Sequence, residues 1–291
     1  MKVFVTGVGG QLGCDVVKEL RRRGMETVGS DVAGDVDVVL DITDEARVEQ
    51  VLTEEKPDAV IHCAAWTAVD AAEDEDKQET VRAINAGGTR NIAMACKKLD
   101  CKMVYISTDY VFDGQGEEPW QPDSRAYAPL NVYGRTKLEG ELAVAELVEK
   151  FFIVRIAWVF GANGGNFVKT MLNIGKKYDT LRVVRDQIGT PTYTSDLAGL
   201  LADMIGTERY GYYHATNEGG FISWYDFACE IFRRAGYDTK VIPVTTEEYG
   251  LSKARRPFNS RLDKSKLARE GFRPLPHWQD ALERYLKEIE E

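Results

Sequence analysis

The sequence has few of the residues that build metal centres and disulfide frameworks. It carries five cysteines and three histidines among 291 residues. The number of cysteines is odd, no Cys-x-x-Cys pair occurs, and no histidine has metal-type spacing from a cysteine pair. These absences disfavour a zinc site and a disulfide-stapled fold. We expect reduced cysteines and no bound metal.

Long apolar runs and an excess of basic charge are also missing. No apolar run approaches the ~20 residues that cross a membrane, and residues 1–7 lead directly into a strand and its turn, unlike a signal peptide. The net charge is −10, whereas proteins that bind nucleic acids or anionic membranes need a basic surface. The sequence therefore predicts a cytoplasmic protein with no nucleic-acid partner and no membrane partner.

What the chain does have is a regular alternation of strand and helix patterns through its first half. Strands are predicted at 2–6, 26–30, 36–40, 59–62, 102–107 and 151–156, with helices at 11–23, 44–55, 80–99 and about 132–150. Such alternation is typical of βαβ units with right-handed crossovers. We predict an α/β protein: a Rossmann-type doubly wound parallel sheet in residues 1–156, and a smaller, mixed α/β substrate-binding lobe mainly in 157–291. Some later segments should return to the first part, and the loop 115–130 could be a lid over a substrate.

A glycine-rich turn follows the first predicted strand and opens the first predicted helix. Gly7, Gly10 and Gly13 are spaced as in turns that bring the backbone close to a dinucleotide pyrophosphate at a helix N-terminus. The competing interpretation is an ordinary strand-to-helix turn. The predicted cofactor contacts are Gly7, Gly10, Gln11, Leu12, Gly13, Asp31, Asp41, Ile42, Ala64, Ala65, Thr67, Tyr133 and Lys137.

Asp31 ends the second predicted strand, where a carboxylate can accept hydrogen bonds from the ribose hydroxyls of the adenosine. No Arg or Lys falls between Gly24 and Asp41 to neutralise a 2′-phosphate. The expected cofactor is NADH or NADPH, with NADH favoured by Asp31. A solvated loop carboxylate is the alternative, and a basic side chain from elsewhere would restore NADPH.

Three further residues form a candidate catalytic set. Tyr133 and Lys137 lie one turn apart on one face of a predicted helix, and Thr108 ends the fifth predicted strand, at the edge where ligands of such sheets bind. Tyr133 would give a proton to a carbonyl oxygen, Thr108 would donate a hydrogen bond to it, and Lys137 would hold the ribose and lower the pKa of the tyrosine. A Tyr and a Lys at this spacing also occur by chance as exposed pairs.

The ordered set of glycine turn, strand-end threonine and Tyr…Lys resembles the extended short-chain dehydrogenase/reductase family. The stretches 66–70, 107–114, 129–137, 166–171, 186–192 and 256–262 are similar to its dTDP-4-dehydrorhamnose reductase branch. The resemblance implies reduction of the C4 ketone of dTDP-4-dehydro-6-deoxy-L-mannose to dTDP-L-rhamnose by NADH or NADPH. The substrate contacts that it implies are Thr67, Val69, Thr108, Trp158, Gln187, Arg256, Asn259 and Arg261.

The chain departs from the branch at two positions: His62 replaces a common Asn, and Trp66 replaces a common His. Some relatives bind magnesium between subunits, but Ser195 stands where a carboxylate would be needed beside Asp15, so no such metal is expected. The resemblance leaves a homodimer open.

Four other functions compete with the reductase. A sugar-nucleotide 4,6-dehydratase would need Asp-Glu after the threonine, and here Asp109 is followed by Tyr110. A 4-epimerase or a related hexulose reductase remains open. A non-catalytic, cofactor-binding regulatory subunit is also possible, although such a protein could lose Tyr133 or Lys137, and both are present.

Overall fold

The computed structural model describes residues 1–290, which are built around a seven-stranded parallel sheet. The strands lie in the order β11-β6-β5-β4-β1-β2-β3. Their bounds are β1 Lys2–Thr6, β2 Glu26–Asp31, β3 Val38–Val39, β4 Ala59–His62, β5 Lys102–Thr108, β6 Phe151–Ile156 and β11 Gly211–His214. The chain runs outward from β1 to β3 and then returns to β4 on the other side of β1. This reversal creates a crevice at the carboxyl ends of β1 and β4, the usual ligand site of a doubly wound sheet.

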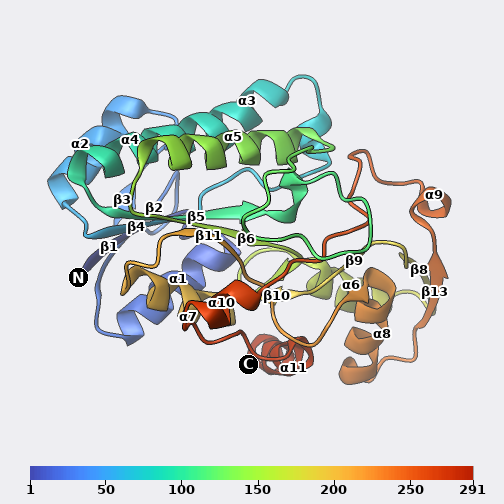
Figure 1. Cartoon of the computed structure of the whole chain (residues 1–291). Helices are drawn as coiled ribbons and strands as arrows, with labels where there is room; N and C mark the ends of the chain where they lie inside the picture. The colour runs from blue at the N-terminus through green and yellow to red at the C-terminus, as the bar shows by residue number, and fades with distance from the viewer. Residues whose placement is uncertain (291) are drawn as a thin grey trace.

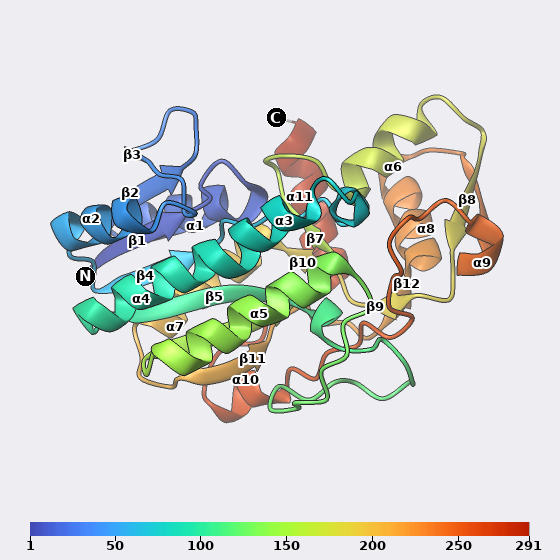
Figure 2. The same cartoon turned by 90° about the horizontal axis from the view of Figure 1, so that it is seen from above.

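Helices cover both faces of this sheet (Figure 1). On one face lie α2 (Glu45–Glu55), α3 (Gln78–Arg82), α4 (Thr89–Leu99) and α5 (Val132–Leu147), and Figure 2 shows α4 and α5 side by side over the strands. On the other face lie α1 (Gln11–Arg22), α7 (Thr194–Ile205) and α10 (Ser265–Arg269). Alternate strand residues supply the two cores, because successive side chains of a strand point to opposite faces: Val3 and Val5 belong to one apolar cluster and Phe4 to the other. The predicted Rossmann-type architecture is confirmed.

Residues after 156 belong partly to the large sheet with its helices and partly to a smaller body. β11 pairs with β6 in the large sheet, and α7 packs on α1. The rest forms a smaller body around a third apolar cluster that includes Phe160, Phe227 and Trp278. Its elements are α6 Phe167–Gly175, α8 Trp224–Ala235, α9 Thr246–Tyr249, α11 Trp278–Glu290 and the strand pairs β7 Val159–Phe160 with β10 Thr192–Tyr193, β8 Thr180–Val184 with β13 Lys240–Val244, and β9 Ile188–Gly189 with β12 Ile222–Ser223. A domain boundary at residue 156 stays a prediction.

Two expected elements differ in detail. The strand expected at 36–40 is reduced to β3, and the helix expected at 80–99 is divided into α3, a wider π-helical segment at Ala83–Gly88, and α4. Asn85 lies in the π-helical segment, where its buried side chain accepts from Trp66 N and donates to Thr136 Oγ1. A buried amide side chain needs hydrogen-bond partners, and the periodicity of a sequence does not reveal which residues these partners are.

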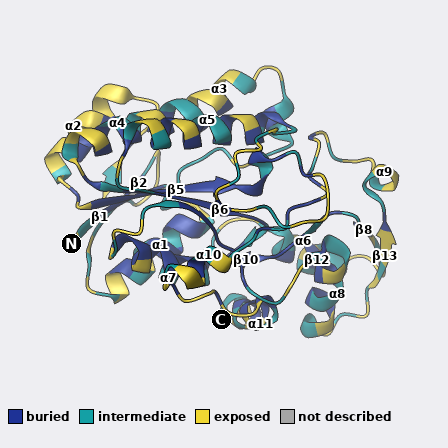
Figure 3. Ribbon diagram, viewed as in Figure 1, coloured by how far each residue is buried: buried dark blue, intermediate teal, exposed yellow. Residues whose placement is uncertain are grey.

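The loop 115–130 lies outside the lining of the cleft in this structure, and its role as a lid stays a prediction. None of its residues lines the cleft, and it is tied to the body by bridges of Phe112 to Tyr127 and of Trp120 to Leu262. The described helices also include none that is long and apolar enough to cross a bilayer. Figure 3 shows the strands of the large sheet as the buried layer, with exposed residues on the outer faces of the helices.

Candidate active site

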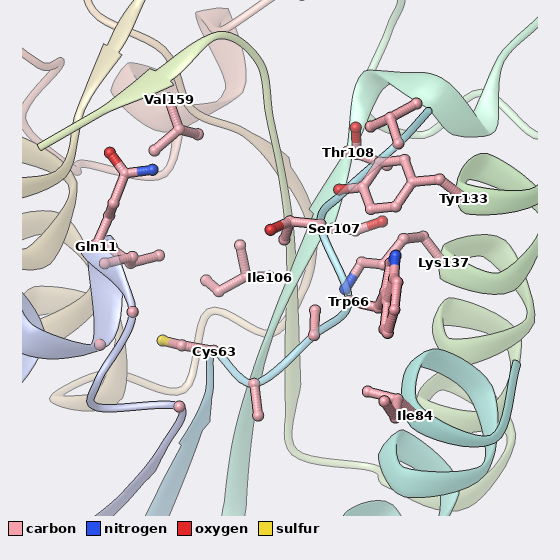
Figure 4. Close-up of a pocket in the computed structure, with 18 of the residues that line it drawn as sticks. Gln11, Cys63, Trp66, Ile84, Ile106, Ser107, Thr108, Tyr133, Lys137 and Val159 are labelled. Carbon is pink, nitrogen blue, oxygen red and sulfur yellow. The ribbon is translucent and has the colours of Figure 1, made fainter. Parts of the chain in front are cut away.

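A cleft of about 1080 Å³ opens at the carboxyl ends of β1, β4 and β5 (Figure 4). Its walls come from the glycine turn, from the strand ends, from α5 and from the smaller body. The structure brings all predicted cofactor contacts into this one lining: Gly7, Gly10, Gln11, Leu12, Gly13, Asp31, Asp41, Ile42, Ala64, Ala65, Thr67, Tyr133 and Lys137. Their direct contact with a cofactor stays a prediction.

The glycine turn passes so close to its neighbours that a side chain would collide. Gly7 has φ +72°, and a Cβ there would lie 2.6 Å from Ala64 N. A Cβ on Gly13 would lie 2.2 Å from Gly7 O. The N-terminus of α1 has no side-chain cap, because its capping residue is Gly10. The amides at this helix end therefore suit the pyrophosphate of a dinucleotide.

At the end of β2, the carboxylate of Asp31 is fixed by two backbone amides. Gly9 N donates to Oδ2 at 2.9 Å, and Val32 N donates to Oδ1 at 2.7 Å. Among the described residues that line the cleft, the basic side chains are Lys137 and Arg256, which come from α5 and from the segment after α9. The Asp31 end of the cleft is thus acidic and suits ribose hydroxyls better than a phosphate.

The start of α5 places the candidate catalytic side chains. Asn131 caps this helix, accepting a hydrogen bond from Gly134 N at 2.8 Å, so that Tyr133 and Lys137 fall in its first two turns. A Cβ on Gly134 would lie 2.3 Å from Tyr110 O, which shows how closely α5 packs on the short 3₁₀ helix η3 (Asp109–Val111). In Figure 4, Thr108, Tyr133 and Lys137 lie along one wall.

Burial shifts the pKa values of both Tyr133 and Lys137. Burial raises the pKa of Tyr133, and a hydrogen bond with Thr108 only partly opposes this. Burial also lowers the pKa of Lys137 to about 7, against the opposing charge of Glu141, and its Nζ lies 4.2 Å from the centre of the Tyr105 ring. In the free site burial therefore dominates the pKa of Tyr133, and a lowering by Lys137 together with the positive ring of a bound cofactor stays a prediction. Tyr133 therefore keeps its proton and is available as an acid.

Four predicted substrate contacts besides Thr108 line the other part of the cleft: Thr67, Val69, Trp158 and Arg256. Trp158 has φ +52°, a left-handed conformation that costs energy for a bulky residue, and its ring stacks at 3.8 Å on that of Trp224. Arg256 Nη2 donates to Asp70 Oδ2 at 2.6 Å, and Arg256 Nη1 donates to the Tyr110 hydroxyl at 3.3 Å. Asp70, whose side chain is half-exposed, holds this guanidinium at the wall of the cleft.

Three other predicted substrate contacts lie outside the lining of the cleft in this structure, and their direct contact with the substrate stays a prediction. Gln187 Nε2 donates to Thr246 Oγ1 at 3.0 Å. Asn259 Nδ2 donates to the carbonyls of the loop 115–118, at 3.2 Å and 2.9 Å. Arg261 Nη1 donates to Asn259 Oδ1 at 3.1 Å. These polar groups are occupied by neighbouring segments, so they order the loops around the site.

Sequence reasoning missed several lining residues. Trp224 begins α8, and no local signal connects it with Trp158. Cys63 lines the cleft as a neutral thiol, because burial raises its pKa to about 12. Ser107 and Asp109 flank Thr108 in the lining, and their place at the strand end could have indicated them.

His62 and Trp66, the two residues that depart from the family pattern, lie in different surroundings. His62 is buried outside the lining, with Nδ1 2.7 Å from Thr6 Oγ1 and Nε2 3.1 Å from Thr89 Oγ1, and burial lowers its pKa to about 3. It is a neutral link between β1, β4 and α4. Trp66 lines the cleft and donates from Nε1 to Ala68 O at 3.1 Å. Within residues 1–290 no three His, Cys, Asp or Glu side chains gather as metal ligands; the expected lack of a metal remains a prediction.

Comparison with known proteins places this geometry in a family. The model of the RmlD substrate binding domain matches residues 1–291. A dTDP-4-dehydrorhamnose reductase of Streptomyces griseus is 42% identical over 285 residues, covering 96% of this chain and 91% of that protein. The crystal structure of a dTDP-4-dehydrorhamnose reductase from Clostridium acetobutylicum superposes with a TM-score of 0.93 at 43% identity, covering 100% of both chains. That of the Bacillus anthracis enzyme in complex with NADP gives a TM-score of 0.92 at 42% identity, covering 99% of both chains. With a family match over its whole length, the chain belongs to the RmlD substrate binding domain family.

Proposed function

We propose that this protein is a dTDP-4-dehydrorhamnose reductase, which reduces the C4 ketone of its dTDP-sugar to give dTDP-L-rhamnose at the expense of NADH or NADPH. The relatives described under that name are 36–42% identical over nearly the whole chain, and one relative was solved with NADP. The observation that carries the proposal is the convergence of Thr108, Tyr133 and Lys137 with the glycine turn in one cleft.

The side chains of this cleft divide the work. The turn at Gly7–Gly13 would hold the pyrophosphate and Asp31 the adenosine ribose, and the bound cofactor supplies a hydride to the ketone carbon. Tyr133, whose pKa burial raises, gives its proton to the ketone oxygen as negative charge develops there. Lys137 would bind the nicotinamide ribose, and its pKa of about 7 rises once a hydrogen-bond acceptor replaces apolar surroundings.

The substrate end of the cleft suits a nucleotide sugar. Thr67 and Val69 would contact the sugar, and the stacked rings of Trp158 and Trp224 offer a flat apolar wall to the sugar or to the thymidine. Arg256 would leave its hydrogen bond with Asp70 and bind the diphosphate instead, because two phosphate oxygens can accept hydrogen bonds from one guanidinium. Gln187, Asn259 and Arg261 would shape the nucleotide site through the loops that they order.

The direct test is turnover of the 4-keto sugar, generated in the same reaction, with NADH and separately with NADPH. We expect stoichiometric cofactor oxidation and formation of dTDP-L-rhamnose, identified by NMR. A 4-epimerase would give a new sugar without net cofactor consumption, and a non-catalytic cofactor-binding protein would give neither. Either of those results would refute the proposal.

Asp31 yields a prediction about cofactor choice. Its carboxylate accepts from two backbone amides at the acidic end of the cleft, and it would repel a 2′-phosphate. We expect Asp31→Ser to raise the ratio of kcat/KM for NADPH to that for NADH at least about tenfold, since removing a close like charge is worth more than ~1.4 kcal/mol. Steady-state kinetics with both cofactors measure this ratio.

The matched control for Asp31 is Asp35, which follows on the same loop and does not line the cleft. Asp35→Ser should leave the ratio unchanged. If Asp31→Ser leaves it unchanged too, Asp31 does not face the 2′ position of the ribose.

A further inference from the structure

A carboxyl group that the mechanism above does not use is held against Thr108. Asp109 directly follows Thr108 at the start of η3, lines the cleft and is only 2% exposed. Its Oδ1 lies 3.0 Å from Thr108 Oγ1. Its Oδ2 is buried and makes no hydrogen bond of good geometry within residues 1–290, although the Ser260 hydroxyl lies close enough to the carboxyl group to favour its charged form. A buried oxygen left unpaired in the wall of a site calls for an explanation.

The hydrogen bonds available to Thr108 are limited, because a hydroxyl has one proton and two acceptor positions. Tyr110 N already donates to Thr108 Oγ1 at 3.2 Å. An ionised Asp109 can only accept, so it takes the single proton of Thr108, and none remains for a substrate ketone. A neutral Asp109 can instead donate to Thr108. Thr108 can then donate its proton to the ketone oxygen. Because Tyr110 N and Asp109 fill both acceptor positions of Thr108, the Tyr133 hydroxyl cannot donate to Thr108 and can donate to the ketone oxygen as well.

We propose that Asp109 is a positioning residue whose neutral carboxyl donates a hydrogen bond to Thr108 and thereby turns the protons of Thr108 and Tyr133 toward the ketone oxygen. This inference rests on the proposed reductase function. Burial supports it by raising the pKa of Asp109 to about 6. The neutral acid therefore dominates below about pH 6, and bound ligands extend its range upward by displacing more water.

The charged and titratable groups around Asp109 come from η3 itself, from α5, and from the segments that hold Asp70 and Arg256. Tyr133 lies on α5, with Lys137 one turn further along the same cleft wall. Tyr110 follows on η3, with Arg256 bonded to its hydroxyl and Asp70 bonded to Arg256. The Ser260 hydroxyl also faces Asp109 and favours its charged form, but burial is the larger influence on the pKa.

The test compares kcat/KM of the native protein and of Thr108→Ala between about pH 5 and pH 9. The ratio of the two isolates the contribution of Thr108, since Tyr133 and Lys137 titrate in both proteins. We expect a ratio that is high at low pH and falls about tenfold as Asp109 ionises, the size of one lost hydrogen bond to a developing charge. A ratio that stays constant across this range would overturn the proposal.

A second pair of proteins identifies the titrating group. Asp109→Asn cannot ionise, and its amide can donate to Thr108, so the ratio of Asp109→Asn to the Asp109→Asn/Thr108→Ala double variant should not change with pH. A persisting pH dependence would mean that another group controls Thr108 and would sink the idea. Failure of the reductase proposal is distinct, because then the native protein would not turn over the sugar at any pH.

Discussion

Replacing Tyr133 by phenylalanine lowers kcat by about 10²–10⁴-fold, the range that a positioned proton donor contributes. The change removes one oxygen and keeps the ring, which lies edge-on to that of Tyr110 with centres 5.6 Å apart. The cleft therefore keeps its shape, and the affinity for NADH should weaken by less than about tenfold. Stopped-flow or steady-state measurement of cofactor oxidation gives kcat, and fluorescence titration of NADH gives the affinity.

The control for Tyr133 is a buried phenol outside the cleft. Tyr213 is fully buried on β11, and its hydroxyl donates to Arg209 O. Tyr213→Phe loses a hydrogen bond of similar kind, so it should cost stability and leave kcat unchanged. If Tyr133→Phe and Tyr213→Phe oxidise cofactor at equal rates, Tyr133 is not the proton donor.

The pH dependence of turnover should follow the burial of these groups. Tyr133 holds its proton throughout the neutral range because burial raises its pKa, so its deprotonation does not limit the rate there. The sequence shows the spacing of Tyr133 and Lys137, and this spacing correctly predicts a shared helix face. It cannot show how far the surroundings of the two residues exclude water, which is what raises the pKa of Tyr133 in the free site.

The parts of the site that the sequence predicts are those with a local cause. The glycine turn is recognisable because its spacing follows a strand and opens a helix, and the close approach of Gly13 is to Gly7 within the same turn; the approach of Gly7 to Ala64, which follows β4, is not local. The sheet follows from the alternation of strands and helices, which leaves few possible topologies. The strand end with Thr108 follows from the same alternation.

The parts that escaped prediction depend on contacts between distant segments. Trp158 meets Trp224, and Arg256 meets Asp70, only after the smaller body has packed on the sheet. Asn259 lies in a sequence motif that implies a substrate contact, yet its side-chain amide donates hydrogen bonds to backbone carbonyls of the loop 115–118. A buried polar side chain forms hydrogen bonds with the groups that the fold places nearest to it, and the sequence does not show which groups these are.

The buried ion pair behind Lys137 carries the largest expected effect on stability. Glu141 lies one turn after Lys137 on α5, and both of its oxygens accept from Arg155 of β6 at 2.8 Å, with neither side chain exposed. Glu141→Gln keeps the shape but leaves the guanidinium of Arg155 without a counter-charge. We expect the free energy of unfolding to fall by about 3–5 kcal/mol, measured by urea denaturation.

The neighbouring carboxylate on the same helix provides the comparison. Glu139 accepts from Arg82 Nε at 2.7 Å, but the Arg82 side chain is largely in solvent and that of Glu139 is partly exposed. Glu139→Gln should change the free energy of unfolding by less than about 1 kcal/mol, because water screens an exposed pair. The two variants remove the same charge from the same helix two residues apart, so the difference between them isolates burial. Equal effects would mean that water reaches Arg155 and Glu141 readily. The surroundings of Lys137 would then be more accessible to water than its pKa of about 7 implies.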